Sequence, residues 1–377
     1  MKYYIIAGEA SGDLHGSNLI LALKEVDPEA EFRVWGGDKM EAASRNLVMH
    51  YRKHAFMGLF PVLWNLRTIW KNFKIVEKDL YNYRPDALVL IDYSGFNLRV
   101  AKKVKNPGLK IYYYISPQVW AWRKSRVNVI KSVVDKLFSI LPFEKEFYKQ
   151  FNFDVEYVGH PLLDAIQEFN SGNQLSKEEF FNLHKLSGKP IIALLPGSRI
   201  QEIKVQLPIM AMMSAKFKDY EFVIAAAPSI KEEMYEPYLQ KYKLKLVRNH
   251  TYELLKFSEA ALVTSGTATL EAALLKVPQV VCYKAGTVSY VIVKHLVNVS
   301  YISIVNLIMD DSVIKELIQK EMNPENIEKE LNLLLNDRSY RSNMIHKYEE
   351  LEKKLGGAGA SKRAAKGMFS DLTGKKA

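Results

Sequence analysis

Short apolar runs alternate with amphipathic, helix-forming stretches along most of the chain. In the first half the strand-like runs are Tyr3–Ala7, Glu31–Trp35, Asp86–Asp92, Lys110–Ser116, Lys136–Leu141 and Val155–Val158. In the second half they are Ile191–Leu195, Glu221–Ala226, Lys245–Val247, Ala260–Thr264 and Gln279–Cys282. Continuous apolar strands between helices are typical of parallel sheets covered on both faces. The pattern predicts an α/β fold of two Rossmann-like, doubly wound domains that face a cleft.

The chain length of 377 residues exceeds that of one ordinary hydrophobic core, so two domains are expected. We place the first domain at 1–165 and the second at 166–355. Residues 161–188 read as a polar, helical connector, and 313–355 as charged helix. Residues 356–377 read as a basic helix or tail, with a return to the first domain or to a partner chain left open. Ligands then belong at the carboxyl ends of the strands.

The composition is that of a globular protein, with 48% hydrophobic and 25% charged residues. The single cysteine, Cys282, lies in an apolar run and permits no disulfide within one chain, which fits a reducing cytoplasm. The apolar run at the N-terminus is too short for a signal peptide. No stretch approaches the ~20 apolar residues of a membrane span.

The net charge of +11 is divided almost evenly between the two halves and forms no long basic run. A nucleic-acid groove is therefore not indicated, because it would gather the charge on one face. Anionic substrates or an anionic membrane surface account better for the excess. A generally basic protein without such a partner is the alternative.

Two strand–turn–helix signatures in the second half predict a phosphate site. They read Leu195-Pro-Gly-Ser-Arg199 and Ser265-Gly-Thr-Ala-Thr-Leu-Glu271. Small-residue turns that lead into helices expose backbone N–H groups and the positive end of the helix dipole, which suit a diphosphate. Arg199 offers a bidentate guanidinium, and Glu271 lies about one turn into its helix, within reach of a sugar hydroxyl. The alternative for Arg199 is that it caps a helix C-terminus.

Acidic residues at strand ends of the first half are candidate general bases. Asp92 ends an apolar strand, Glu9 and Asp13 lie in the first strand–helix turn, and His160 follows a later strand. The alternatives are a turn or cap carboxylate for Asp92, a helix N-cap for Asp13 and a satisfied loop histidine for His160. No Asp-x-Asp pair or metal-ligand spacing is present. We therefore expect a site without metal or cofactor, in which Arg199 and helix N-termini carry the leaving-group charge.

Residues 55–74 mix bulky apolar and basic side chains as an interfacial segment does. The residues expected to contact lipid are Phe56, Met57, Phe60, Trp64, Arg67, Trp70 and Lys71. Trp122 and Arg123 are further candidates for the same surface. The alternatives are an ordinary helix packed on the sheet for 55–74 and a structural loop for the other two.

Six motifs in order resemble one family. They are Gly8-Glu-Ala-Ser-Gly-Asp13, Pro117-Gln-Val-Trp-Ala-Trp-Arg123, Leu141-Pro-Phe-Glu-Lys145, Gly159-His-Pro161 and the two turns above. Over nearly its whole length the chain is similar to the lipid-A-disaccharide synthases. The resemblance implies a B-type glycosyltransferase that moves diacylglucosamine from UDP-2,3-diacylglucosamine to the 6-hydroxyl of 2,3-diacylglucosamine 1-phosphate (lipid X). It implies inversion without metal at the cytoplasmic face of the inner membrane, by a monomer or homodimer.

The resemblance also implies that 1–165 is an acceptor- and lipid-binding domain and 166–355 a nucleotide-sugar-binding domain, and it implies roles for individual residues. The family's general base falls on Asp92, and its first-turn acids fall on Glu9 and Asp13. Its nucleotide-sugar site falls on Ser198, Arg199, Ser265, Gly266, Thr267, Glu271 and Asn306. The chain departs from the family pattern at Val305, where Pro is expected, and at Asp310-Asp-Ser312, where Gly-Arg-Glu is expected.

Two other functions fit the same architecture. A UDP-N-acetylglucosamine-type epimerase would need no lipid-facing segment and would turn over a substrate without acyl chains. A non-catalytic, membrane-associated protein would bind the nucleotide sugar and transfer nothing.

Overall fold

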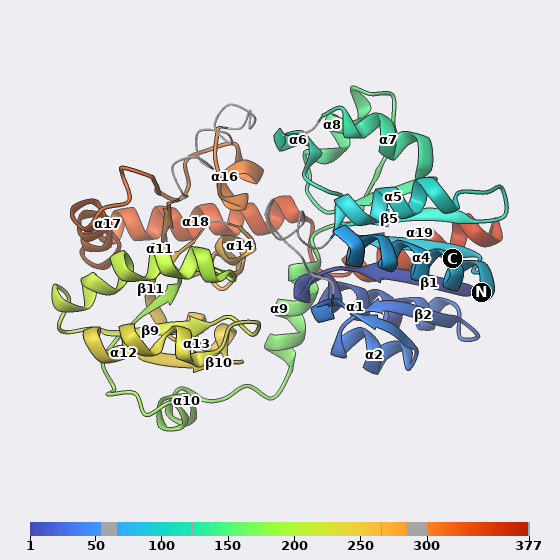
Figure 1. The fold of residues 1–377 in the computed structure, drawn as a ribbon. Helices are drawn as coiled ribbons and strands as arrows, with labels where there is room; N and C mark the ends of the chain where they lie inside the picture. Colours follow the sequence, from blue (N-terminus) through green and yellow to red (C-terminus); the bar gives the residue numbers. More distant parts are fainter. Residues whose placement is uncertain (54–65, 123, 265, 285–299, 376–377) are drawn as a thin grey trace. The chain divides into compact units, whose positions relative to one another are not determined.

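The structure is a computed structural model that describes residues 1–53, 66–122, 124–264, 266–284 and 300–375 (Figure 1). The chain divides into two compact units. Unit 1 comprises Met1–Asp164 and Gly357–Ala377, and unit 2 comprises Ala165–Gly356.

Unit 1 is built on a parallel sheet of seven strands in the order β3-β2-β1-β4-β5-β6-β7. The strands are β1 Lys2–Ala7, β2 Glu31–Gly36, β3 Leu47–His50, β4 Ala87–Ile91, β5 Lys110–Tyr114, β6 Lys136–Ser139 and β7 Glu156–Tyr157. The strand order reverses between β1 and β4, so the carboxyl ends of these two strands mark the expected ligand edge of unit 1.

Helices cover both faces of this sheet (Figure 1). They are α1 Ala10–Val26, α2 Asp38–Ser44, α4 Leu66–Tyr83, α5 Ser94–Val104, α6 Val119–Trp122, α7 Arg126–Val133, α8 Glu144–Lys149, α19 Ala360–Thr373 and the 3₁₀ turn η1 Tyr51–Lys53. Alternate residues of β1 enter different cores. Tyr4 and Ile6 pack with α4, α5 and α7, while Tyr3 and Ile5 pack with α1 and α19. Burial on both faces explains why the strands read as continuous apolar runs.

Helix α19 belongs to unit 1 although it closes the chain, and it packs against α1 and β5. Its N-terminus is capped by Asp164, which accepts hydrogen bonds from the backbone N–H groups of Gly359, Ala360 (3.2 Å) and Ser361 (3.0 Å). On the sheet side, Tyr112 donates to Asp371 Oδ2 at 2.8 Å. The returning segment therefore completes the core of unit 1.

Unit 2 holds a parallel sheet of six strands in the order β10-β9-β8-β11-β12-β13. The strands are β8 Ile191–Leu195, β9 Glu221–Ala226, β10 Lys245–Arg248, β11 Ser258–Val263, β12 Gln279–Tyr283 and β13 Glu316–Ile318. The order reverses between β8 and β11, which marks the ligand edge of this unit.

The helices of unit 2 cover its sheet in the same way. They are α10 Lys177–Leu183, α11 Ile200–Ala211, α12 Glu236–Tyr242, α13 Thr251–Lys256, α14 Thr267–Leu274, α16 Ile304–Met309, α17 Pro324–Asn336 and α18 Arg338–Leu355, with 3₁₀ turns η2 Met212–Ala215 and η3 Glu232–Met234. Helix α9, Pro161–Ser171, contains the boundary between the units.

The predicted α/β class with two doubly wound domains is confirmed, with two local corrections. Strand β3 was not predicted, and β13 lies in a stretch predicted to be helical. Both are edge strands of four and three residues, too short for a clear hydrophobic period. Among the described residues, no helix combines the length and apolar character needed to cross a membrane.

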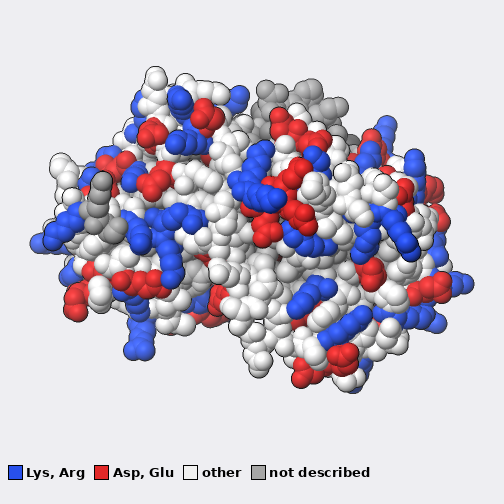
Figure 2. Space-filling view, turned by 180° about the vertical axis from the view of Figure 1, so that it is seen from behind, with Lys and Arg blue, Asp and Glu red and all other residues white. Residues whose placement is uncertain are grey.

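On the face shown in Figure 2, Lys and Arg side chains are interspersed with Asp and Glu. This face offers no continuous basic stripe of the kind that follows a nucleic-acid backbone.

Candidate active site

The ligand edge of unit 1 brings two of the predicted acids to neighbouring loops. Strands β1 and β4 pair with Ala7 opposite Ile91, so the turns that carry Glu9 and Asp92 leave the sheet side by side. The ring of Tyr93 lies against Gly8, where an added Cβ would come within 2.4 Å of Tyr93 Cγ. Only glycine permits this approach of the two turns.

Asp92 lies in an unusual turn directly after β4. Its φ is 44°, and that of Tyr93 is 45°, so two consecutive non-glycine residues adopt the left-handed region. The backbone oxygen of Asp92 accepts hydrogen bonds from Tyr113 Oη (2.6 Å) and Asn97 Nδ2 (2.9 Å). These contacts hold the turn in place, and the side chain of Asp92 is half-buried. Such an over-determined, strained turn is typical of functional sites.

Glu9 is the N-cap residue of α1 and is also half-buried. Burial, and then the charge of Glu9, raise the pKa of Tyr93. Because Tyr93 follows Asp92 directly, the Glu9 carboxylate lies in the electrostatic environment of the Asp92 turn. The structure therefore groups Glu9 with Asp92.

Asp13 has a structural task that the sequence did not show. Its carboxylate is buried and accepts hydrogen bonds from the backbone N–H groups of Gly37 (2.7 Å), Met40 (2.9 Å) and Lys39 (3.1 Å). These groups form the N-terminus of α2. The helix-cap alternative thus describes Asp13, although the helix it caps is α2 and not its own. These three hydrogen bonds give Asp13 a structural role, and its predicted catalytic role stays a prediction.

His160 is buried at the start of α9, next to another buried histidine. Burial, reinforced by His15, lowers the pKa of His160 to about 3. Its Nδ1 accepts a hydrogen bond from the Leu162 N–H at 3.2 Å. Burial lowers the pKa of His15 to about 4, and His15 Nδ1 has no hydrogen-bond partner. His160 is therefore a neutral, interior side chain, close to the satisfied-histidine alternative.

The ligand edge of unit 2 brings the two predicted phosphate turns together. Strands β8 and β11 pair with Leu195 opposite Val263, and α11 and α14 begin just beyond them. Gly266 is the N-cap of α14 with a φ of 109°, a backbone conformation that favours glycine. Thr267, the first residue of α14, is exposed, and Ser265 lies outside the described residues.

The first turn already holds an anion from its own helix. Ser198 and Arg199 are exposed, and Arg199 is the N-cap of α11, not a C-cap. The Glu202 carboxylate accepts from the Ser198 N–H at 3.0 Å and from Arg199 Nη1 at 2.8 Å. It thus occupies the N–H groups and the guanidinium predicted to meet phosphate, which shows that the turn accommodates an oxyanion.

Glu271 is held by a tyrosine that sequence reasoning missed. Tyr252 on α13 donates to Glu271 Oε1 at 3.2 Å. Burial raises the pKa of Glu271, and the hydrogen bond from Tyr252 opposes that rise. The residue is partly buried, and Tyr252 orients one of its carboxylate oxygens. No spacing in the sequence links Tyr252 to Glu271.

Asn306 is fully buried, and its amide is used within unit 2. Its Nδ2 donates to Ile314 O (2.9 Å) and Glu316 Oε1 (3.0 Å), and its Oδ1 accepts from the Ile314 N–H (3.0 Å). Both amide hydrogens are thereby engaged, so Asn306 has a structural role in unit 2, and its predicted ligand contact stays a prediction. Asp310 has a φ of 54°, which explains why glycine is expected there in the family.

Most of the predicted lipid segment cannot be placed. Phe56, Met57, Phe60, Trp64 and Arg123 lie outside the described residues, and no side-chain position is described for Arg67 or Trp122. Helix α4 covers the rest. Its inner face packs Val76 and Leu80 into the core, as the ordinary-helix alternative holds, whereas Trp70 is 65% exposed and Lys71 is exposed.

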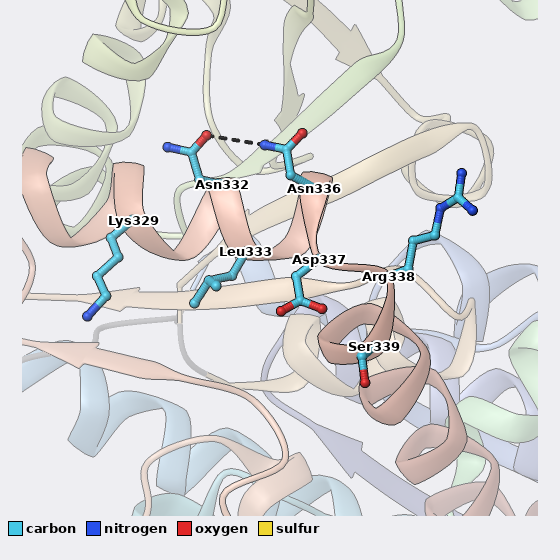
Figure 3. Close-up of a pocket in the computed structure, with 7 residues that line it drawn as sticks. All are labelled: Lys329, Asn332, Leu333, Asn336, Asp337, Arg338 and Ser339. Carbon is cyan, nitrogen blue, oxygen red and sulfur yellow. Dashed lines mark hydrogen bonds between the residues drawn. The ribbon is translucent and has the colours of Figure 1, made fainter.

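A surface hollow of about 780 Å³ lies in unit 2 away from these residues (Figure 3). It is lined by Lys329, Asn332, Leu333, Asn336, Asp337, Arg338 and Ser339. Asp337 Oδ1 accepts from the Tyr340 N–H at 3.0 Å as the N-cap of α18, and Asn336 donates to Asn332 at 3.4 Å. Its polar groups thus serve the junction of α17 and α18. In the described part of the chain, no three His, Cys, Asp or Glu side chains are grouped as metal ligands.

Known proteins resemble this chain over almost its whole length. The family model "Lipid-A-disaccharide synthetase" matches residues 3–367. The lipid-A-disaccharide synthase of Syntrophus aciditrophicus is 38% identical over 368 residues, covering 96% of this chain and 95% of that relative. That of Coxiella burnetii (strain Dugway) is 36% identical over 366 residues, covering 96% of each chain.

Solved structures share the fold at low identity. A putative UDP-N-acetylglucosamine 2-epimerase from Listeria monocytogenes aligns with a TM-score of 0.70 at 14% identity, covering 99% of this chain and 97% of that one. The calicheamicin glycosyltransferase CalG4 aligns with a TM-score of 0.57 at 13% identity, covering 99% and 98%. These likenesses concern the fold alone. The family match over almost the whole length decides the assignment, and the chain belongs to the lipid-A-disaccharide synthase family of glycosyltransferases.

Proposed function

We propose that this enzyme transfers 2,3-diacylglucosamine from UDP-2,3-diacylglucosamine to the 6-hydroxyl of 2,3-diacylglucosamine 1-phosphate. The products are the β-1,6-linked disaccharide 1-phosphate and UDP. The observation that carries the proposal is the family match along residues 3–367. The strained turn at Asp92 and the oxyanion-holding turn at Arg199 support it with groups suited to the two halves of the reaction.

In the proposed step Asp92 is the general base. It takes the proton as the O–H bond of the acceptor 6-hydroxyl breaks, and the acceptor oxygen bonds to the anomeric carbon of the donor sugar. The bond from that carbon to the diphosphate breaks, and its electron pair leaves with UDP. A single displacement of this kind inverts the anomeric configuration. Glu9, in the same electrostatic environment, is the second acid of the acceptor site.

The donor is assigned to unit 2. The N-termini of α11 and α14 face the diphosphate, with Arg199 as the cation and Ser198, Ser265, Gly266 and Thr267 as the turn residues. Glu271, oriented by Tyr252, meets the ribose. We propose that these groups stabilise the leaving UDP without metal or cofactor.

The acylated substrates call for contact with lipid. We propose that the enzyme is a cytoplasmic, peripheral protein of the inner face of the inner membrane, active as a monomer or homodimer. Trp70 and Lys71 on the outer face of α4, together with residues 56–67, form the proposed contact. An exposed tryptophan beside basic residues suits the interface of an anionic bilayer.

Mass spectrometry of the transfer products, together with proton NMR to distinguish epimers of equal mass, tests this function against its rivals. Incubation of UDP-2,3-diacylglucosamine with lipid X should give the disaccharide 1-phosphate and UDP. UDP-N-acetylglucosamine 2-epimerases share this fold. UDP-N-acetylglucosamine is therefore incubated with the enzyme in parallel and should remain unchanged. Conversion of UDP-N-acetylglucosamine to an epimer, or binding of UDP with no transfer product, would reject the proposal.

A further inference from the structure

A buried carboxylate outside the assigned residues organises the loop that follows β5. Glu144, the first residue of α8, is 1% exposed. Its Oε1 accepts hydrogen bonds from Ser116 Oγ (2.9 Å) and Trp120 Nε1 (3.3 Å). Its Oε2 accepts from the backbone N–H groups of Ile140 (3.3 Å) and Leu141 (3.2 Å). One side chain thus ties the loop after β5 to the loop after β6.

This arrangement is costly for stability alone. None of the four donors carries a charge, so no ion pair compensates for removing the carboxylate from water. Burial raises the pKa of Glu144 to about 7, against the opposing effect of its hydrogen bonds. The nearby titratable groups are Tyr148 on α8 and Tyr157 on β7, whose pKa values Glu144 raises in turn. An apolar residue would avoid this penalty but would leave the four donors without their acceptor, so the carboxylate is placed to hold the two loops together.

Residues on either side of the loop that Glu144 holds donate hydrogen bonds to the turn that contains Asp92. After Trp120 the chain reaches Arg126, whose Nη1 donates to Ser94 Oγ at 3.0 Å. Ser94 starts α5, two residues after Asp92. Before the loop, Tyr113 on β5 donates to the backbone oxygen of Asp92. Tyr113 and Arg126 therefore both contact the Asp92 turn. Glu144 holds Ser116 and Trp120, which lie between them in the sequence.

We propose that Glu144 is a positioning residue for glycosyl transfer. By holding Ser116 and Trp120 it sets where Arg126 meets the Asp92 turn, and so the placement of the catalytic carboxylate relative to the acceptor. The inference rests on the proposed role of Asp92 as the general base. It adds to the site a residue that touches neither substrate.

The first test compares Glu144→Gln with Glu146→Gln, an exposed acid on the same helix. Glutamine keeps the size of the side chain but replaces one acceptor oxygen with an amide that cannot accept. We expect kcat to fall about 10- to 100-fold, the scale of a small misplacement of reacting groups. The KM for the UDP-sugar and the UDP affinity should stay unchanged. Glu146→Gln should keep kcat within about twofold.

A second variant protects the test against loss of folding. Thermal melting is recorded for each protein, and rates are measured well below the midpoint. If Glu144→Gln does not fold, Ser116→Ala removes one of the four hydrogen bonds and should lower kcat in the same selective way. A folded Glu144→Gln or Ser116→Ala enzyme with more than half of the wild-type kcat would overturn the proposal.

A double-mutant cycle tests whether Glu144 acts through the loop. Arg126→Gln removes the contact with Ser94 and should also lower kcat. If both residues serve one arrangement, the double variant should be no slower than the slower single variant. Losses that multiply would show that Glu144 acts independently of the loop, and would overturn the inference.

The Asp92→Asn background separates this inference from the proposed function. If Glu144 acts by placing the base, adding Glu144→Gln to Asp92→Asn should not reduce turnover further. Loss of activity in Asp92→Asn with normal activity in Glu144→Gln would reject only the positioning role. Normal activity in Asp92→Asn with a slow Glu144→Gln enzyme would reject Asp92 as the base, while the role of the loop would stand.

Discussion

Asp92, the proposed general base, lies in a strained turn directly after β4. Replacement by Asn keeps the hydrogen bonds to its backbone oxygen but removes the proton acceptor. General-base assistance contributes about 100- to 10,000-fold, so Asp92→Asn should lower kcat by that range. Because UDP binding is assigned to unit 2, the UDP dissociation constant should not change. Steady-state kinetics with calorimetry on UDP checks both, and retention of more than half the turnover would exclude Asp92 as the base.

Replacing Arg199 and replacing Glu271 should affect the binding of UDP and pyrophosphate in different ways. Arg199→Ala removes a charged hydrogen-bond donor and should weaken UDP and pyrophosphate alike, by about 1.5–3 kcal/mol. Glu271→Ala should weaken UDP but leave pyrophosphate binding unchanged, since its proposed partner is the ribose. Tyr252→Phe is the companion variant and should show a smaller loss of the same kind. Calorimetry on both ligands decides, and equal losses with Glu271→Ala would rule out a ribose contact.

The buried pair His15 and His160 should make unit 1 sensitive to acid. Their folded pKa values, about 4 and about 3, lie below the ordinary 6.5, so the unfolded chain binds protons first. Stability should be complete above pH 6.5 and fall toward pH 4, by up to ~1.4 kcal/mol per pH unit for each histidine. All five tryptophans belong to unit 1, so their fluorescence in urea reports on this unit. His160→Gln should flatten the slope, and the exposed His346→Gln should not.

Helix α11 carries its own competitor for the diphosphate. The Glu202 carboxylate caps the helix and pairs with Arg199, which is where the donor phosphate should bind. Glu202→Gln keeps an acceptor oxygen for the cap but removes the negative charge. We therefore expect UDP to bind more tightly to this variant at low salt, with the gain shrinking as salt is added. Weaker binding at all salt concentrations would mean that Glu202 supports the phosphate turn and does not compete with it.

Helix α4 carries two exposed aromatic residues, Trp70 and Tyr81, for which we predict different roles. Trp70 is next to Lys71 and is assigned to lipid contact, whereas Tyr81 lies near the other end of the helix. Their exposed fractions are 65% and 74%, so replacing either by Ser should change the melting temperature little. Trp70→Ser should reduce sedimentation with anionic vesicles and raise the KM for acylated substrates, and Tyr81→Ser should do neither. Equal behaviour of the two variants would count against a lipid site at Trp70.

Within each unit, strand order places the candidate residues more than any local motif does. In unit 1 the reversal between β1 and β4 brings Glu9 next to Asp92, although 83 positions separate them along the sequence. In unit 2 the reversal between β8 and β11 does the same for Arg199 and Gly266. The two units therefore share one architecture, and in each the expected ligand edge lies where the strand order reverses.

The sequence by itself determined the class of fold and the family, and it predicted a ligand edge in each half of the chain. Continuous apolar strands between helices can form only a sheet covered on both faces, and small-residue turns at strand ends have few other conformations. These properties depend on residues that are close together in the sequence, so they can be predicted from the sequence alone. The Asp92 and Arg199 turns were found for the same reason.

Only the tertiary structure decided which polar residues are buried and hydrogen-bonded within their own unit. Asp13, His160 and Asn306 looked like site residues because their types and positions suited chemistry, yet each is buried and bonded to groups distant in the fold or in a neighbouring turn. Tyr252 gave no signal, and Glu144 appeared only within the Leu141–Lys145 motif with no role assigned to it, because the partners of both are set by packing between separate loops. Hydrogen-bond partners across a core depend on how elements meet in space, and no pattern along the chain encodes that directly.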